Sequence, residues 1–119
     1  MFTFQTICDE GDEVLTTDPF YTNYRTVFQQ LGIEVEAFKT DPKEGFALPE
    51  IEEIEKHIND KTVAILLSNP TNPTGALYSE EEIMRIVELA KKHDLYIVAD
   101  EVYREFIYDG NDYKSFGEV

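Results

Sequence analysis

The sequence is poor in cysteine, histidine and tryptophan, and these shortages narrow what the protein can be. It has one cysteine, two histidines and no tryptophan among 119 residues. Cys8 cannot form an internal disulfide, which is typical of a reducing compartment, so we expect a cytoplasmic protein. We expect Cys8 to be a small residue near a helix end rather than a reactive thiol. His57 and His93 lie on separate predicted helices without ligand-like spacing, so we expect surface histidines and no metal site.

Positive charge and long apolar runs are scarce as well. Ten Lys and Arg residues stand against 25 Asp and Glu, which gives a formal net charge of −15 at pH 7. This balance argues against nucleic acid or an anionic membrane as a partner. No apolar run approaches the roughly 20 residues of a membrane span, and the first residues lack the basic and apolar regions of a signal peptide. Hydrophobic residues still make up 42% of the chain, a globular composition that suits one domain with one core.

Two common phosphate-binding motifs are missing. The sequence contains neither G-x-G-x-x-G nor G-x-x-x-x-G-K-[ST]. The stretch "YIVADE" resembles the Mg²⁺-binding strand of P-loop enzymes, but that interpretation requires the second motif upstream. The dinucleotide and P-loop fingerprints are therefore both excluded.

Apolar runs of strand length alternate with segments of helical period. We predict strands at 13–18, 33–38, 62–68 and 95–100, the second at a sheet edge and the third covered on both faces. Strands that alternate with crossover helices predict right-handed β-α-β units and a parallel sheet. The predicted fold class is therefore α/β, with three α-β-α layers and a mainly parallel sheet of about four strands.

Three helices are predicted between these strands. The first ends at Gly32, and the second begins near Pro49, which suits the first turn of a helix. The third begins at a capping box formed by Ser79 and Glu82. The predicted inward-facing residues are Tyr24, Val27, Phe28, Leu31, Ile51, Ile54, Ile58, Ile83, Ile86, Val87 and Ala90.

Three of the predicted strands lead into unusual polar and aromatic segments, "DPFYTNY", "NPTNPTG" and "DEVYREF". Ligands bind parallel sheets beyond the carboxyl ends of the strands, so we expect these segments to meet at one edge. Asp100 ends a buried strand, where a carboxylate needs a cation or a donor. It could bind a metal, a basic side chain or a protonated ring nitrogen, or it could cap the following segment.

Asn72 lies in a segment with two Asn-Pro pairs, which favours a fixed loop that places one side-chain amide. Tyr21 and Tyr103 add an aromatic face and a phenolic donor. Together with Asp100 these groups suit a flat heteroaromatic ligand that has a hydroxyl group and a basic ring nitrogen.

These segments, in this order and approximate spacing, resemble the PLP-dependent aminotransferases of class I/II, fold type I, over nearly the whole chain. Within the family the sequence is most similar to the aspartate aminotransferases. The resemblance implies that residues 1–119 are a single partial domain, the central portion of the PLP-binding large domain. It also implies an enzyme that uses pyridoxal 5'-phosphate to move an amino group between an amino acid, here aspartate, and a 2-oxo acid, here 2-oxoglutarate.

The resemblance assigns four cofactor-binding residues. Asp100 would pair with the pyridinium nitrogen of PLP, and Tyr103 would donate a hydrogen bond to the phenolic oxygen of the ring. Asn72 would bind the same oxygen and help hold the substrate α-carboxylate. Tyr21 would stack on the ring, where many aspartate aminotransferases have tryptophan. Tyr24 would lie behind Asp100.

The resemblance also implies that some family residues lie outside this chain. The Schiff-base lysine and the arginine that binds the substrate carboxylate are expected after Val119, and the Gly-rich phosphate-binding turn is expected before Met1. Lys114 lacks the matching context, so no catalytic residue is expected here and the isolated chain should be inactive. The parent would form a homodimer. The 95–100 strand would be an open edge through which the fragment associates.

Three alternatives stay open. A PLP-dependent β-lyase or synthase of the same fold shares the pattern of Asn, Asp and Tyr. A transcription regulator with an aminotransferase-like effector domain would need a helix-turn-helix segment upstream. An α/β module that binds no cofactor would have a purely structural Asp100, and replacing that residue by Asn would then leave PLP affinity unchanged.

Overall fold

The computed structural model describes residues 1–119, and its centre is a four-stranded sheet in the order β2-β1-β3-β4. The strands are β1 (Glu13–Asp18), β2 (Glu34–Lys39), β3 (Thr62–Ser68) and β4 (Tyr96–Asp100), and every pair is parallel. The predicted parallel α/β sheet is confirmed. The prediction that the second strand lies at an edge is confirmed too, and β4 forms the opposite edge.

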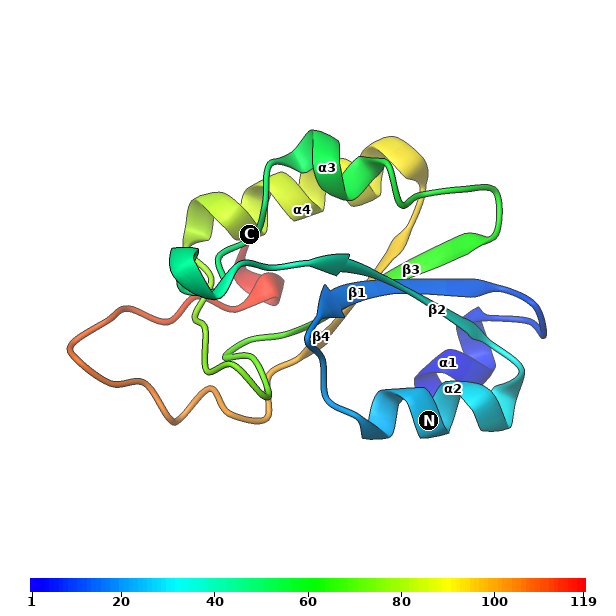
Figure 1. Ribbon diagram of the computed structural model, residues 1–119, viewed down its shortest axis with the longest axis horizontal. Coiled ribbons are helices and arrows are strands. Elements are labelled where there is room, and N and C mark those ends of the chain that lie inside the picture. Colours follow the sequence, from blue (N-terminus) through cyan, green and yellow to red (C-terminus); the bar gives the residue numbers. More distant parts are fainter.

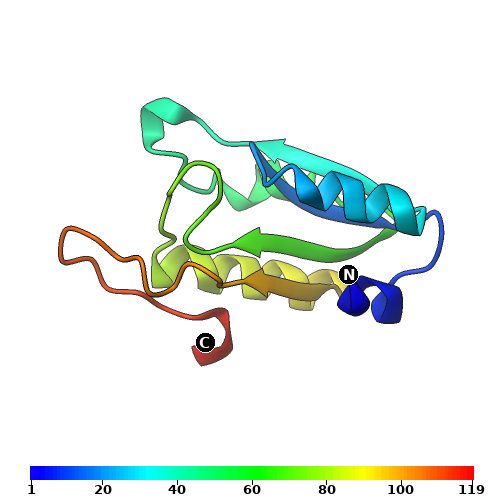
Figure 2. The ribbon, with the colours of Figure 1, turned by 90° about the horizontal axis from the view of Figure 1, so that it is seen from below.

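Helices cover both faces of this sheet. α1 and α2 lie on one face and α3 and α4 on the other, which gives the three predicted layers (Figures 1 and 2). None of the helices combines the length and the apolar character that a membrane-spanning segment requires. The helical segments are α1 (Phe2–Ile7), α2 (Asn23–Leu31), α3 (Ile51–Glu55) and α4 (Glu80–His93), with 3-10 turns η1 (Pro42–Glu44) and η2 (Phe116–Glu118).

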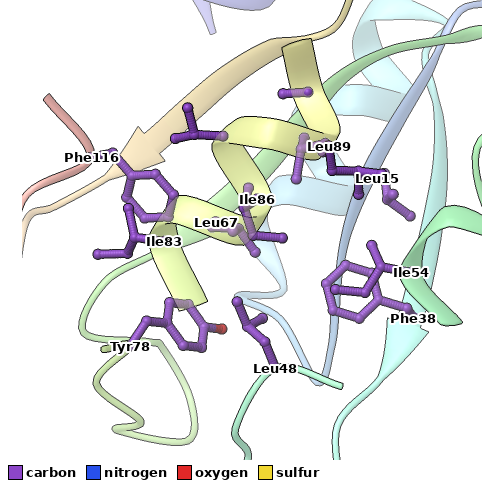
Figure 3. Packing of buried hydrophobic residues seen from close by; sticks show 13 residues of the cluster. Leu15, Phe38, Leu48, Ile54, Leu67, Tyr78, Ile83, Ile86, Leu89 and Phe116 are labelled. Carbon is purple, nitrogen blue, oxygen red and sulfur yellow. The ribbon is translucent and has the colours of Figure 1, made fainter. Parts of the chain in front are cut away.

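Alternate residues of the two central strands face opposite layers. Leu15 and Ile65 lie in a cluster of 13 buried residues beneath α3 and α4, which Figure 3 shows. Val14 and Ala64 lie in a smaller cluster beneath α1 and α2. Because side chains alternate along a strand, a strand with both faces covered needs apolar residues at consecutive positions. This explains the continuous apolar run in β3.

The caps predicted at Gly32 and at Ser79 are confirmed, whereas Pro49 lies before the N-cap of α3, Glu50, and not in its first turn. Gly32 ends α2 in the left-handed conformation with φ 68°. At α4 the hydroxyl of Ser79 accepts from the backbone N–H of Glu82, whose carboxylate accepts from the N–H of Ser79. The other carboxylate oxygen of Glu82 accepts from the N–H of Leu48 at 2.9 Å, which joins the loop before α3 to α4. The predicted stripe of α4 is buried, and Leu89 is buried with it.

The predicted extent of the second helix is wrong. α3 ends at Glu55, whereas the sequence pattern predicted that Ile58 would still lie within it. The N–H groups of His57 and Ile58 donate to carbonyl groups three residues earlier, so the last turn tightens and the helix stops. Ile58 nevertheless packs against the larger cluster, as its apolar character predicted.

The prediction of two surface histidines is also wrong in part, because each is half-buried against a carboxylate. His57 Nδ1 lies 2.5 Å from Glu36 Oε1 on β2, and His93 Nε2 lies 2.5 Å from Glu55 Oε1. Lys92 Nζ lies 2.6 Å from the same oxygen of Glu55. These pairs tie α3 to the sheet and to the end of α4.

Cys8 lies at the end of α1, as predicted, and is half-buried. Burial raises the pKa of its thiol, and the nearby carboxylates of Asp12 and Asp9 raise it further. A thiol with a raised pKa holds little of the nucleophilic thiolate at neutral pH. No group of three or more His, Cys, Asp or Glu residues in the structure could hold a metal ion.

Candidate functional site

The first Asn-Pro pair after β3 has a structural task. Asn69 is fully buried, and its side-chain oxygen accepts from the N–H of Tyr78 at 3.1 Å. Its amide donates to the carbonyl of Lys114 at 3.2 Å. The hydroxyl of Ser68 donates to the carbonyl of Pro70 at 2.9 Å. Asn69 therefore closes the loop between β3 and α4 and joins it to the C-terminal segment.

The second Asn-Pro pair stands on a turn that Thr71 organises. The N–H of Thr71 donates to the carbonyl of Ala76 at 2.8 Å, and its own carbonyl accepts from Gly75 at 2.9 Å. The hydroxyl of Thr71 accepts from the N–H of Ala76 at 2.9 Å. Gly75 has φ 75°, which favours glycine. Asn72 takes part in none of these bonds, so its half-buried amide is left to face the adjoining cavity.

The structure brings all four predicted site residues around one open cavity of about 300 Å³. Tyr21, Asn72, Asp100 and Tyr103 line it together with Val102. Tyr21 follows β1, Asn72 follows β3, and Asp100 ends β4, which are three adjacent strands of the sheet. The arrowheads of β3 and β4 point to the same side in Figure 2, where the loops after these strands lie, and β1 runs parallel to β3. Val102 is a lining residue that the sequence pattern did not indicate.

A hydrogen bond from Tyr24 holds the carboxylate of Asp100 in place. The hydroxyl of Tyr24 on α2 donates to Asp100 Oδ2 at 2.5 Å, which places Tyr24 where the resemblance implied. Burial raises the pKa of Tyr24, and the hydrogen bond to Asp100 raises it further, so the phenol stays a neutral donor. Asp100 is the only charged side chain that lines the cavity. A cationic or hydrogen-bond-donating group of a ligand would therefore be attracted to it.

Tyr21 and Tyr103 contribute aromatic surface to the cavity. The ring of Tyr21 meets Tyr24 edge-on, with centroids 5.5 Å apart, and Asn23 Nδ2 donates to its hydroxyl at 2.6 Å. Tyr103 packs edge-on against Phe106, with centroids 6.1 Å apart. Tyr21 and Tyr103 are 37% and 39% exposed. Both therefore keep ring surface that a flat ligand could cover.

A second cavity of about 340 Å³ adjoins the first. Asn72 and Tyr103 line both cavities and form the wall between them. On the far side Phe106 and Tyr108 face the loop around Gly75. Sequence reasoning missed these residues, although aromatic residues at 103, 106 and 108 in "YREFIY" were a usable signal.

Comparison with known proteins places this chain in a family. Residues 1–118 match the model for aminotransferase class I and II. The chain therefore belongs to this family, and the resemblance seen in the sequence is confirmed.

Individual members show how close the similarity is. The aspartate/prephenate aminotransferase of Thermus thermophilus is 38% identical over 107 residues, which are 90% of this chain and 28% of that protein. The alanine aminotransferase of Mycobacterium tuberculosis is 35% identical over 117 residues, 98% of this chain and 27% of that protein. A solved double mutant of the Thermus thermophilus aspartate aminotransferase gives a TM-score of 0.89 at 38% identity, covering 98% of this chain and 30% of that one. The chain thus spans less than a third of the length of these relatives.

Proposed function

We propose that this chain forms part of the pyridoxal 5'-phosphate site of an aminotransferase. The observation that supports this most is the cavity in which Asp100, held by Tyr24, faces the space between Tyr21, Asn72 and Tyr103. A carboxylate, an amide, a phenol and an exposed ring lie at one edge of a parallel sheet, where such folds bind ligands. The family to which the chain belongs uses this cofactor, which agrees with the donor set.

The side chains fit the groups that the cofactor would present. Asp100 would accept from the protonated ring nitrogen and keep the proton there, and Tyr24 would hold the carboxylate in that orientation. Asn72 and Tyr103 would donate to the phenolic oxygen, and Tyr21 would cover one face of the ring. When bound, the cofactor supplies an electron-withdrawing ring that stabilises negative charge on the substrate.

We propose an amino acid and a 2-oxo acid as substrates of the whole protein, with aspartate and 2-oxoglutarate as the first candidates. Asn72 would help to hold the substrate α-carboxylate, since its amide takes part in none of the hydrogen bonds that fix its loop. The similarity to relatives named for alanine as well as aspartate makes alanine a second candidate amino donor. We also propose that the whole protein is a homodimer, as the family suggests. We propose a cytoplasmic location because a chain with a single cysteine suits a reducing compartment.

The chain on its own is proposed to be inactive in transamination. The step that moves a proton on the substrate needs a base within hydrogen-bond reach. No lysine lines the cavity, and Lys114 Nζ lies 3.7 Å from a carboxylate oxygen of Glu80. We therefore expect this chain to bind the cofactor without catalysing transamination.

The experiment is a titration of the chain with pyridoxal 5'-phosphate, followed by absorbance and near-UV circular dichroism. We expect a saturable induced signal and at least about tenfold weaker binding in Asp100→Asn, since a hydrogen bond to a charged group contributes about 1.5–3 kcal/mol and a tenfold change in affinity corresponds to about 1.4 kcal/mol. Asp60→Asn is the matched control, because Asp60 is exposed in the turn before β3, at the other end of the sheet. Equal signals in all three proteins would indicate only scattered lysine adducts and would contradict the proposal.

A further inference from the structure

A long loop follows β4 and bounds both cavities. Residues 102–114, here called the aromatic loop, contain no helix or strand. The loop extends away from the sheet and returns beside it, drawn in orange to red at the lower left of Figure 1. It contributes Tyr103 to both cavities, and Phe106 and Tyr108 to the second.

The two ends of the aromatic loop are joined through one side chain, Glu101. The hydroxyl of Ser115 lies 2.9 and 2.8 Å from the two carboxylate oxygens of Glu101, which share its single hydrogen. The backbone N–H of Phe116 donates to the same carboxylate at 2.9 Å. The ring of Phe116 is buried in the larger core cluster, where Figure 3 shows it beside Ile83. Glu101 therefore ties the return of the loop to the end of β4 at a point that the core already fixes.

The loop itself has few other hydrogen bonds. Those inside it are local, such as the N–H of Phe106 donating to the carbonyl of Tyr103 at 2.8 Å and the N–H of Asn111 donating to that of Tyr108 at 3.2 Å. At its C-terminal end, the carbonyl of Lys114 accepts from the amide of Asn69. A segment with mainly local bonds and exposed side chains opens at low cost in free energy unless its ends are held. The position of Tyr103 then depends on the carboxylate that closes the loop.

We propose that Glu101 is a positioning residue that acts through the aromatic loop to hold Tyr103 at the wall between the two cavities. The part of this inference that concerns a cofactor rests on the proposed function, whereas the part that concerns the loop does not. Glu101 does not line either cavity, so its effect on binding is indirect, and we expect it to pass through Tyr103.

The first test measures amide hydrogen exchange without any ligand in the chain and in Glu101→Ala. We expect exchange in peptides covering 102–114 to become on the order of tenfold faster, with peptides of β3 and α4 unchanged. Glu101→Gln should restore most of the protection, because its side-chain oxygen can still accept from the N–H of Phe116. Glu105→Ala is the control, since the carboxylate of Glu105 pairs with Arg104 inside the loop. Unchanged exchange in Glu101→Ala would overturn the proposal, and loss of protection throughout the sheet would do so as well, because Glu101 would then be a general stability residue.

The second test asks whether the effect passes through Tyr103. Pyridoxal 5'-phosphate affinity is measured in the chain, in Glu101→Ala, in Tyr103→Phe and in the double variant. We expect Glu101→Ala to weaken binding about fivefold alone and less than about twofold when Tyr103 is already Phe, because residues in one pathway are not additive. Additive losses would overturn the positioning role. If the unaltered chain binds no cofactor, the proposed function fails, and the exchange result alone decides the role of Glu101.

Discussion

The hydroxyl of Tyr24 holds the carboxylate of Asp100, on which the proposed site depends. This hydrogen bond should make a measurable contribution to the free energy of unfolding. Tyr24→Phe removes the donor to Asp100 and should lower the free energy of unfolding by about 1 kcal/mol. The folded-state pKa of Tyr24 is raised from 10.0, so this stabilisation is complete below that pH and is lost as pH rises through the raised value. The difference between the two proteins should therefore shrink above about pH 10. Urea unfolding at neutral and alkaline pH checks this.

Tyr96→Phe is the matched control, because Tyr96 is 58% exposed at the sheet edge. An equal loss in both variants, or a loss in Tyr24→Phe that does not change with pH, would contradict the role assigned to the hydroxyl.

The site residues that could be predicted from the sequence are those at or just after the carboxyl end of a strand. Asn72 and Asp100 follow or end adjacent parallel strands, so a general rule of sheet geometry brought them together. The tasks of Asn69 and Glu101 were not predictable. Asn69 bonds a carbonyl 45 residues away and Glu101 a backbone N–H 15 residues away, and no local pattern marks such partners.

At the scale of elements, α3 depends on charged contacts at its end. The pKa of Glu55 is held below its ordinary value of 4.5, first by the hydrogen bond from Lys92 and then by that from His93. A lowered folded-state pKa stabilises the fold above 4.5, and this contribution is lost as pH falls through the lowered value. Glu55→Gln should therefore be less stable than the unaltered chain at pH 7, and the difference should vanish in acid.

Chemical unfolding of Glu55→Gln and of the unaltered chain, repeated from pH 7 downward in steps below pH 4.5, follows how this difference changes. Glu52→Gln serves as the control, because Glu52 lies on the same short helix and is exposed. A difference of the same size at every pH would show that Glu55 acts through packing rather than through charge.

Element positions followed from the sequence wherever a cap or a period was strong. The capping box at Ser79 and the glycine at 32 gave α4 and α2 their bounds. The end of α3 was mispredicted because Ile58 lies at a helical spacing from Ile54, although the α-helix has already ended and the backbone there forms a tighter turn. The spacing of apolar residues indicates which of them face the core. It does not indicate whether the backbone between them forms an α-helix or a 3-10 turn.

At the scale of the whole molecule, two opposing properties decide whether the chain associates. Both edges of the sheet are open, and β4 is the apolar one, with sequence Tyr-Ile-Val-Ala-Asp, whereas β2 has Glu34, Glu36 and Lys39. Open apolar edges favour pairing with another strand, and charged edges disfavour it. The net charge of −15 opposes any association through repulsion that salt screens.

We therefore expect association through the β4 edge that increases with protein concentration and with salt. The carbonyl of Asp100 accepts from the N–H of Asn69, so alternation along the strand turns the peptide group of Ala99 outward. Ala99→Pro removes that outward N–H, spares the bonds to β3, and should weaken self-association about fivefold or more. Ala37→Pro on β2 is the matched control, because Glu34 N–H donates toward β1 and Ala37 lies three positions later, facing outward. Sedimentation velocity over a series of protein and salt concentrations measures the association. Equal effects of the two prolines would show that the chains do not associate specifically through β4. A monomer under every condition would contradict the prediction and show that charge repulsion outweighs the open edge.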